Sequence, residues 1–306
     1  MLEAVCTACC NATLLSGDPS WLELFRMQVD ELWSLRKEDS DGILVPNRHG
    51  DGGWFDYEPH HASGTLRLLM HAYVVGRCDE DMARIEQRYG DRPLPQADTP
   101  PGIGKAGSFD IHNWFEYLVG RNPEFPQKTL EATQAEMRRR LDRIDSDSLD
   151  WRTWRDEPDW QDVHHWQEIN PVVPEGLMQM AMGTPAAIYH GGIVHATVRY
   201  FDPAAQRPGL PACTAALVEP QTDDGFHVNL VNTDILEPRD LIIQAGAFAE
   251  HEFIDARVDG AATPSAATPV DDRYVRVRLG PAVHARIHCR LKRLCHQPTY
   301  DRPSFD

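Results

Sequence analysis

Apolar positions recur at helical spacing through the first part of the chain. Residues 2–16 are apolar or small on most sides, and residues 21–33 carry large apolar side chains three and four positions apart. Gly17, Asp18 and Pro19 stand between the two patterns, and these residue types are typical of a helix end followed by a helix start. The spacing predicts a helical hairpin over residues 2–33.

The same arrangement recurs further along the chain. Helices are expected over 61–75 and 79–89, then over 112–119 and 126–144, with Gly76 and Gly120 at the turns, and a last helix over 175–182. A single helical hairpin cannot bury its own apolar face, so repeated hairpins are expected to stack on one another. We therefore predict a series of stacked helical hairpins over residues 1–184.

The pattern changes to alternation from about residue 185. Short β-branched segments separated by Pro, Gly and Asp predict strands near 188–201, 213–218, 226–232, 240–248, 252–258, 273–279 and 283–291. Seven such segments are typical of an antiparallel β-sandwich. The predicted fold class is multidomain, with a helical-hairpin domain over 1–184 followed by a β-sandwich domain over 185–306.

Composition narrows the possible partners. A content of 42% apolar and 25% charged residues in 306 residues suits a soluble globular protein. The formal charge of −17 repels phosphate backbones, so nucleic acid is not an expected partner. No membrane-spanning run and no signal peptide stand out, and reduced thiols would suit the cytosol, although the compartment and the oligomeric state stay open.

Chemically versatile side chains gather in three long connections between the predicted helices, at 38–60, 90–111 and 145–172. Loops of such length are uncommon unless they are functional. Connections that follow every second helix emerge on one face, so we expect these three to form one rim. Their candidate substrate-binding residues are Asn47, Arg48, Trp54, His60, Asp110, His112, Asn113, Trp114, Trp160, His164, His165 and Trp166.

Helical hairpins in series, Trp-rich rim loops and a C-terminal β-sandwich together resemble the (α/α) toroid, or six-hairpin, superfamily of carbohydrate-active enzymes. The resemblance is architectural and is carried by the hairpin turns and the rim loops. A complete toroid has more helices than this sequence predicts, so the chain would correspond to a C-terminal portion of it. The resemblance implies an oligosaccharide or polysaccharide as partner, and glycoside hydrolysis as the reaction.

Hydrolysis needs a carboxylic acid to protonate the leaving oxygen and a second carboxylate as base or nucleophile. Glu58 is the preferred acid, because Trp54 and Tyr57 could shield it from water, and Asp51 is the preferred base. Asp56 is a further candidate.

Two alternatives to hydrolysis remain. A polysaccharide lyase would neutralise a uronate with Asn47, Arg48 or His49, and would remove a proton with Tyr57 or His49. A non-catalytic reading makes the chain a carbohydrate-binding or structural part of a larger protein.

No cofactor is expected. The adjacent His residues at 60–61 and 164–165 lack the spacing that places two imidazoles on one ion, so no metal site is expected there either.

Overall fold

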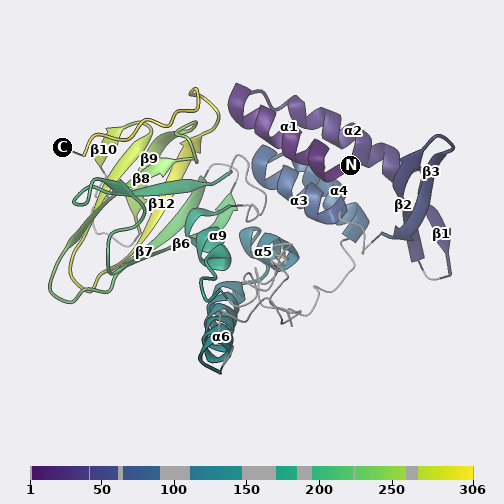
Figure 1. The fold of residues 1–306 in the computed structure, drawn as a ribbon. Helices are drawn as coiled ribbons and strands as arrows, with labels where there is room; N and C mark the ends of the chain where they lie inside the picture. Colours follow the sequence, from purple (N-terminus) through teal and green to yellow (C-terminus); the bar gives the residue numbers. More distant parts are fainter. Residues whose placement is uncertain are drawn as a thin grey trace, which may run out of the picture. The chain divides into compact units, whose positions relative to one another are not determined.

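A computed structural model describes residues 2–40, 42–60, 65–89, 111–146, 170–184, 195–222, 225–259 and 268–305. The chain divides into two compact units, each of which is built from separate stretches of sequence (Figure 1). The N-terminal unit comprises Met1–Pro93, Phe248–Glu252 and Lys292–Arg302, and the sheet unit comprises Leu94–Ala247, Phe253–Leu291 and Pro303–Asp306.

Four helices form the main part of the N-terminal unit: α1 (Leu2–Ser16), α2 (Trp21–Ser34), α3 (Thr65–Gly76) and α4 (Asp79–Tyr89). Their apolar stripes are buried, as in Leu22 and Phe25 of α2 and Leu69 of α3. A buried ion pair links α2 to α4, where Arg26 donates two hydrogen bonds to the Asp81 carboxylate at 2.9 and 2.7 Å. This pairing satisfies two charges that would otherwise be costly to bury.

A three-stranded antiparallel sheet follows α2 and precedes α3 in the sequence. Its strands are β1 (Lys37–Asp39), β2 (Gly42–Gly50) and β3 (Gly53–Pro59), in the order β1-β2-β3. The predicted loop over 38–60 is therefore wrong. Asp51 and Gly52 form the turn of a β2–β3 hairpin, and Gly53, with a left-handed φ of 97°, follows them at the start of β3.

Three helices and two sheets form the described part of the sheet unit. The helices are α5 (Ile111–Leu118), α6 (Phe125–Ser146) and α9 (Glu175–Met182). The five-stranded sheet has the order β10 (Thr268–Asp271), β11 (Tyr274–Leu279), β8 (Arg239–Ala245), β4 (Val198–Asp202), β5 (Arg207–Pro208). The four-stranded sheet has the order β6 (Thr214–Thr222), β7 (Gly225–Asn232), β12 (His284–Lys292), β9 (Glu252–Val258).

One apolar core is shared by the two sheets. Tyr200, Ile243 and Val277 enter it from the five-stranded sheet, and Val228 and Ile287 enter it from the four-stranded sheet. Alternate residues of β7 are buried, as its burial pattern shows. Burial of every second side chain is the expected result when one face of a strand packs against a second sheet.

The predicted fold class, a partial (α/α) toroid followed by a sandwich, is wrong. In the described part of the chain the helices number seven, and α1–α2 and α3–α4 form two of the predicted hairpins, which contact each other through α1 and α3. The series does not continue into a toroid, because α5, α6 and α9 group with the large sheets and the sheet β1–β3 is inserted in the sequence between α2 and α3. Helical periodicity indicates that one face of a helix is covered, but it does not say whether a helix or a sheet covers it.

Antiparallel strands do occupy the C-terminal part of the chain, as the alternating pattern indicated. The predicted domain boundary after residue 184 stays a prediction.

Candidate functional site

Most of the candidate residues from the first predicted connection lie on the β2–β3 hairpin. Directly opposite residues of an antiparallel pair share a face, and so do residues two apart on one strand. His49 pairs with Trp54 and Val45 pairs with Glu58, so that Asn47 lies between these two pairs on the same face. We call the side of the hairpin that carries Asn47, His49, Trp54 and Glu58 the hairpin face.

Two contacts organise the hairpin face. The Asn47 side chain donates a hydrogen bond from Nδ2 to Glu58 Oε2 at 3.4 Å. The ring of His49 packs edge to face with Trp54, with ring centroids 4.9 Å apart and planes at 75°. An amide, a carboxylate, an imidazole and an indole thus stand side by side on one accessible surface, with Trp54 and Glu58 half-buried.

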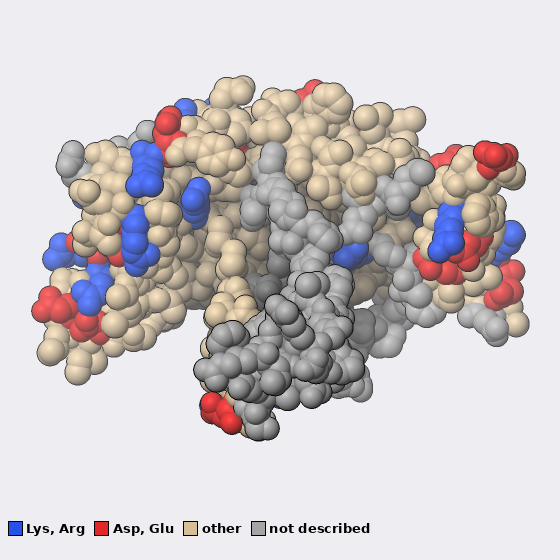
Figure 2. Space-filling view, viewed as in Figure 1, with Lys and Arg blue, Asp and Glu red and all other residues tan. Residues whose placement is uncertain are grey.

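The opposite side of the hairpin carries a different set of residues. Arg48, Phe55 and Tyr57 lie there, and the Lys37 ammonium stands 3.6 Å from the centroid of the Tyr57 ring. Arg48 Nε pairs with Asp56 Oδ2 at 3.1 Å, and both side chains are at least half exposed. Figure 2 shows basic and acidic side chains close together on the surface that β1–β3 form.

Asp56 interrupts the strand pairing. Its φ of 58° is left-handed, and the pairing between Pro46↔Tyr57 and Arg48↔Phe55 skips this position. Among residue types other than glycine, the short polar residues Asn and Asp adopt this conformation most easily. The register is the same on both sides of Asp56, and its side chain forms the ion pair with Arg48.

The structure does not bring Asp51 to Glu58. Asp51 is exposed in the turn, beyond the last pair Gly50↔Gly53, whereas Glu58 lies five residues further along β3. Five residues of strand span about 16 Å, which exceeds the roughly 5–9.5 Å between the two carboxyl groups of glycosidases. Asp56, two residues from Glu58, is the nearer carboxylate.

His60 is buried and serves as an anchor of the hairpin. Its ring centroid lies 4.7 Å from that of Trp33 and 4.4 Å from that of Tyr89, and its Nδ1 lies 3.4 Å from the Tyr89 hydroxyl. Its backbone N–H donates to the Ile43 carbonyl at 2.8 Å. These contacts fix the end of β3 to the helices of the N-terminal unit and leave His60 off the hairpin face.

The candidates of the second predicted connection lie on α5 of the sheet unit. Trp114 is fully buried, and its Nε1 donates to the Thr184 carbonyl at 2.9 Å. Asn113 is buried and accepts a hydrogen bond from Asn122 at 3.2 Å, whereas His112 is half-buried. Packing therefore accounts for Trp114 and Asn113. Asp110, Trp160, His164, His165 and Trp166 lie outside the described residues.

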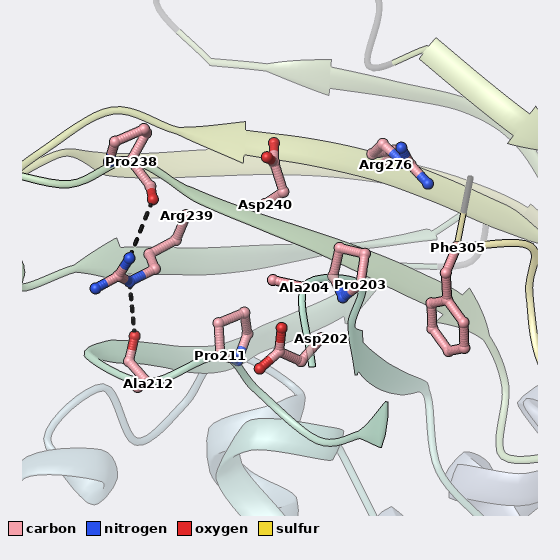
Figure 3. Close-up of a pocket in the computed structure, with 10 residues that line it drawn as sticks. All are labelled: Asp202, Pro203, Ala204, Pro211, Ala212, Pro238, Arg239, Asp240, Arg276 and Phe305. Atoms are coloured by element: carbon pink, nitrogen blue, oxygen red, sulfur yellow. Dashed lines mark hydrogen bonds between the residues drawn. The ribbon is translucent and has the colours of Figure 1, made fainter. Parts of the chain in front are cut away.

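A cavity of about 490 Å³ opens on the sheet unit, at positions that the sequence did not single out (Figure 3). Its charged lining residues already have partners. Asp202 accepts from the backbone N–H of Ala205 at 3.1 Å, and Asp240 accepts from Arg278 at 3.2 Å. Arg239 donates to backbone carbonyls within the lining, as the dashed lines show. We therefore take the hairpin face as the candidate functional site.

Comparison with known proteins gives a match for part of the chain. Residues 37–178 match the model of a protein family described as "Domain of unknown function (DUF8034)". The match begins at Lys37, the first residue of β1, and so includes the whole hairpin. A search of curated proteins found no match, and neither did a search of solved structures.

Among the helices of the described ranges, none combines the length and the apolar character that a bilayer crossing requires.

Proposed function

We propose that the protein acts on carbohydrates, that the hairpin face binds the sugar, and that Glu58 is the acid of a glycoside hydrolysis. The observation that supports this most is the grouping of Asn47, His49, Trp54 and Glu58 on one accessible face. Residues 37–178 match a domain family, which is compatible with a function that this segment shares with other members of the family.

Sugar binding suits the residue types on this face. Sugars present apolar faces that stack on aromatic rings and hydroxyls that pair with amides, carboxylates and imidazoles. Trp54 would supply the ring, and its contact with His49 restricts its rotation, which lowers the entropy lost on binding. Asn47 and Glu58 would then pair with hydroxyl groups of a neighbouring sugar residue of the same oligosaccharide, because Trp54 and Glu58 stand four strand residues, or about 13 Å, apart.

Hydrolysis by Glu58 requires a proton transfer to the glycosidic oxygen. The carboxyl O–H would protonate that oxygen as the bond to the anomeric carbon breaks, and Asn47 Nδ2 would hold the carboxyl in position through the bond to Oε2. Asp56 would act as the second carboxylate, because it is nearer than Asp51 and stands opposite Asn47 in the register. After leaving its exposed ion pair with Arg48, it would take a proton from the water that adds to the anomeric carbon. The charge of −17 favours a neutral sugar over a polyanionic one.

Elimination has less support than hydrolysis. Tyr57 lies on the other side of the hairpin from Asn47 and His49, under the Lys37 ammonium. Asn47 and His49 are the lyase candidates that stay together on the hairpin face, and the charge of −17 disfavours a uronate as their substrate.

Incubation of the purified protein with neutral and uronic-acid oligosaccharides tests the reaction. We expect new reducing ends without the ultraviolet absorbance of unsaturated products. Glu58→Gln should lower kcat by about a hundredfold or more, because a general acid contributes about 10²–10⁴-fold. Glu38→Gln is the matched control, since Glu38 is an exposed carboxylate of β1 in the same sheet.

The outcomes separate the alternatives. Absorbance of unsaturated products would overturn hydrolysis in favour of elimination. Binding without turnover would reduce the proposal to a carbohydrate-binding surface, and the absence of binding to every sugar would reject it altogether.

A further inference from the structure

Three side chains with metal-ligating atoms meet in the N-terminal unit, away from the hairpin. Glu252 stands at the start of β9, and Cys295 and His296 follow the end of β12. Glu252 Oε2 lies 3.7 Å from Cys295 Sγ and 3.5 Å from His296 Nε2. One ligand atom from each of the three residues lies within 4.8 Å of the others.

The separations fit a tetrahedral zinc ion. Bond lengths of about 2.3 Å to sulfur and about 2.0–2.1 Å to nitrogen and oxygen place tetrahedral ligands about 3.5 Å apart for sulfur and oxygen. The same bond lengths give about 3.3 Å for nitrogen and oxygen. The observed distances of 3.7 and 3.5 Å exceed these values by about 0.2 Å. Small side-chain rotations would suffice to seat the ion.

The backbone holds the ligands in place. The N–H groups of Cys295 and His296 both donate to the carbonyl of Glu250, at 3.0 and 3.2 Å. The N–H of Leu294 donates to His251 Nδ1 at 2.9 Å. Two chain segments that are separated by about forty residues are thus fixed against each other, and the cluster is organised before any ion binds.

The mixture of ligand types indicates which ion would bind. A thiolate and an imidazole suit zinc, whereas calcium and magnesium prefer sites made of oxygen ligands. A carboxylate and a thiolate together carry two negative charges, which match a divalent cation. The competing cation is Lys292, whose Nζ lies 3.8 Å from Glu252 Oε2 and whose side chain is mostly exposed, so that it can turn away.

We propose that Glu252, Cys295 and His296 bind one Zn²⁺, with a fourth position open to water. Catalytic zinc sites usually have three protein ligands and a fourth position that is open to water or substrate. The ion would also join Phe248–Glu252 to Lys292–Arg302 within the N-terminal unit.

Titration of the chelator-treated protein with Zn²⁺ tests the proposal. We expect one equivalent to bind, and the midpoint of thermal unfolding to rise with the zinc concentration, because the ion binds the folded state. Replacement by Co²⁺ should give the near-ultraviolet absorption of a thiolate–cobalt bond. This measurement needs no substitution, so it stands even if a variant fails to fold.

Variants assign the ligands. Glu252→Gln, Cys295→Ser and His296→Asn should each weaken zinc binding at least tenfold, and Cys295→Ser should remove the thiolate–cobalt absorption. Cys213→Ser is the matched control, since Cys213 is an exposed thiol outside the cluster. Lys292→Gln should preserve or tighten binding, because it removes the competing cation.

Two results would overturn the site. No stoichiometric zinc at micromolar concentration would leave the cluster as an ion-pair network of Glu252 with His296 and Lys292. Retention of the thiolate–cobalt signal in Cys295→Ser, or its loss in Cys213→Ser, would place the metal elsewhere.

Discussion

Trp54 and Phe55 are neighbours in the chain whose side chains point to opposite sides of the hairpin. Trp54 lies opposite His49 and on the same face as Glu58, whereas Phe55 lies opposite Arg48 and is half exposed. The two residues are both aromatic, and they differ in which side they present to a ligand. A sugar bound to the hairpin face would contact Trp54 and miss Phe55.

His71 of α3 makes the stability of the protein depend on pH. Its Nε2 is buried. Burial is the larger cause and the positive charge of Arg67 the smaller cause that together lower the pKa of this imidazole to about 4. The ordinary pKa is about 6.5, so the unfolded state binds the proton more tightly than the folded state does. The contribution of His71 is therefore complete above about pH 6.5 and is lost as the pH falls toward 4.

Urea unfolding at two pH values tests this prediction. The shift from about 6.5 to about 4 makes the free energy of unfolding about 2 kcal/mol lower at pH 5 than at pH 7.5 on account of His71. His71→Gln cannot take up the proton, so the pH dependence of this variant should be smaller by that amount. An equal pH dependence in both proteins would contradict the assignment to His71.

At the scale of elements, the helices and the C-terminal strands were predictable, but the hairpin was not. Val45 and Pro46 are the buried residues of β2, and the other positions of β2 and β3 are exposed or partly exposed. A strand pair with little burial has no reason to alternate, and it leaves no apolar period to read. The Asp51-Gly52 pair was the available signal, since it is a common hairpin turn.

The hairpin face and the Glu252 cluster also differ in how far the sequence could predict them. Asn47, His49, Trp54 and Glu58 are close in sequence, so their residue types could be recognised together. Their common face follows from the strand pairing, whereas the sequence pattern predicts a loop there. Glu252 and Cys295 are far apart in the chain, and no local spacing connects them. Only the pairing of distant segments brings them together.

Gly225 is required by the packing of β7 against β12. A Cβ at this position would stand 2.0 Å from the Cys289 carbonyl oxygen and 3.0 Å from Arg290 Cα. Backbone atoms cannot move aside as a flexible side chain can, so Gly225→Ala should lower the free energy of unfolding by about 2–3 kcal/mol.

The control for this prediction is Gly52→Ala in the hairpin turn. A Cβ there meets nothing within 4 Å, and the substitution should change the free energy of unfolding by less than about 0.5 kcal/mol. Both values come from urea titrations followed by circular dichroism. A Gly225→Ala variant as stable as the unsubstituted chain would show that the two strands are spaced differently.

At the scale of the whole molecule, the N-terminal unit is completed by residues from near the end of the chain. Arg293 donates hydrogen bonds to the carbonyls of Val75 and Gly76, at the end of α3. The last carbonyls of a helix have no partner within the helix and carry a partial negative charge. Burial lowers the pKa of Arg293 to about 10, which still leaves the guanidinium charged at neutral pH.

Arg293→Met should destabilise the protein. The substitution keeps much of the apolar contact but leaves the two carbonyls of α3 without their donor, at a cost of about 2–3 kcal/mol. Arg302→Met is the control, because Arg302 is exposed, and it should change the free energy of unfolding by less than about 0.5 kcal/mol. Urea unfolding measures both, and equal stability of the two variants would show that Arg293 does not secure the end of α3.

The central claim is that the hairpin face binds a carbohydrate, and one titration tests it most directly. Oligosaccharides that bind the unsubstituted protein would be titrated calorimetrically into Trp54→Ala and Phe55→Ala. We predict that Trp54→Ala weakens binding at least tenfold, or about 1.4 kcal/mol, and that Phe55→Ala changes it less than about twofold. Equal losses in both variants, or full binding by Trp54→Ala, would contradict the claim.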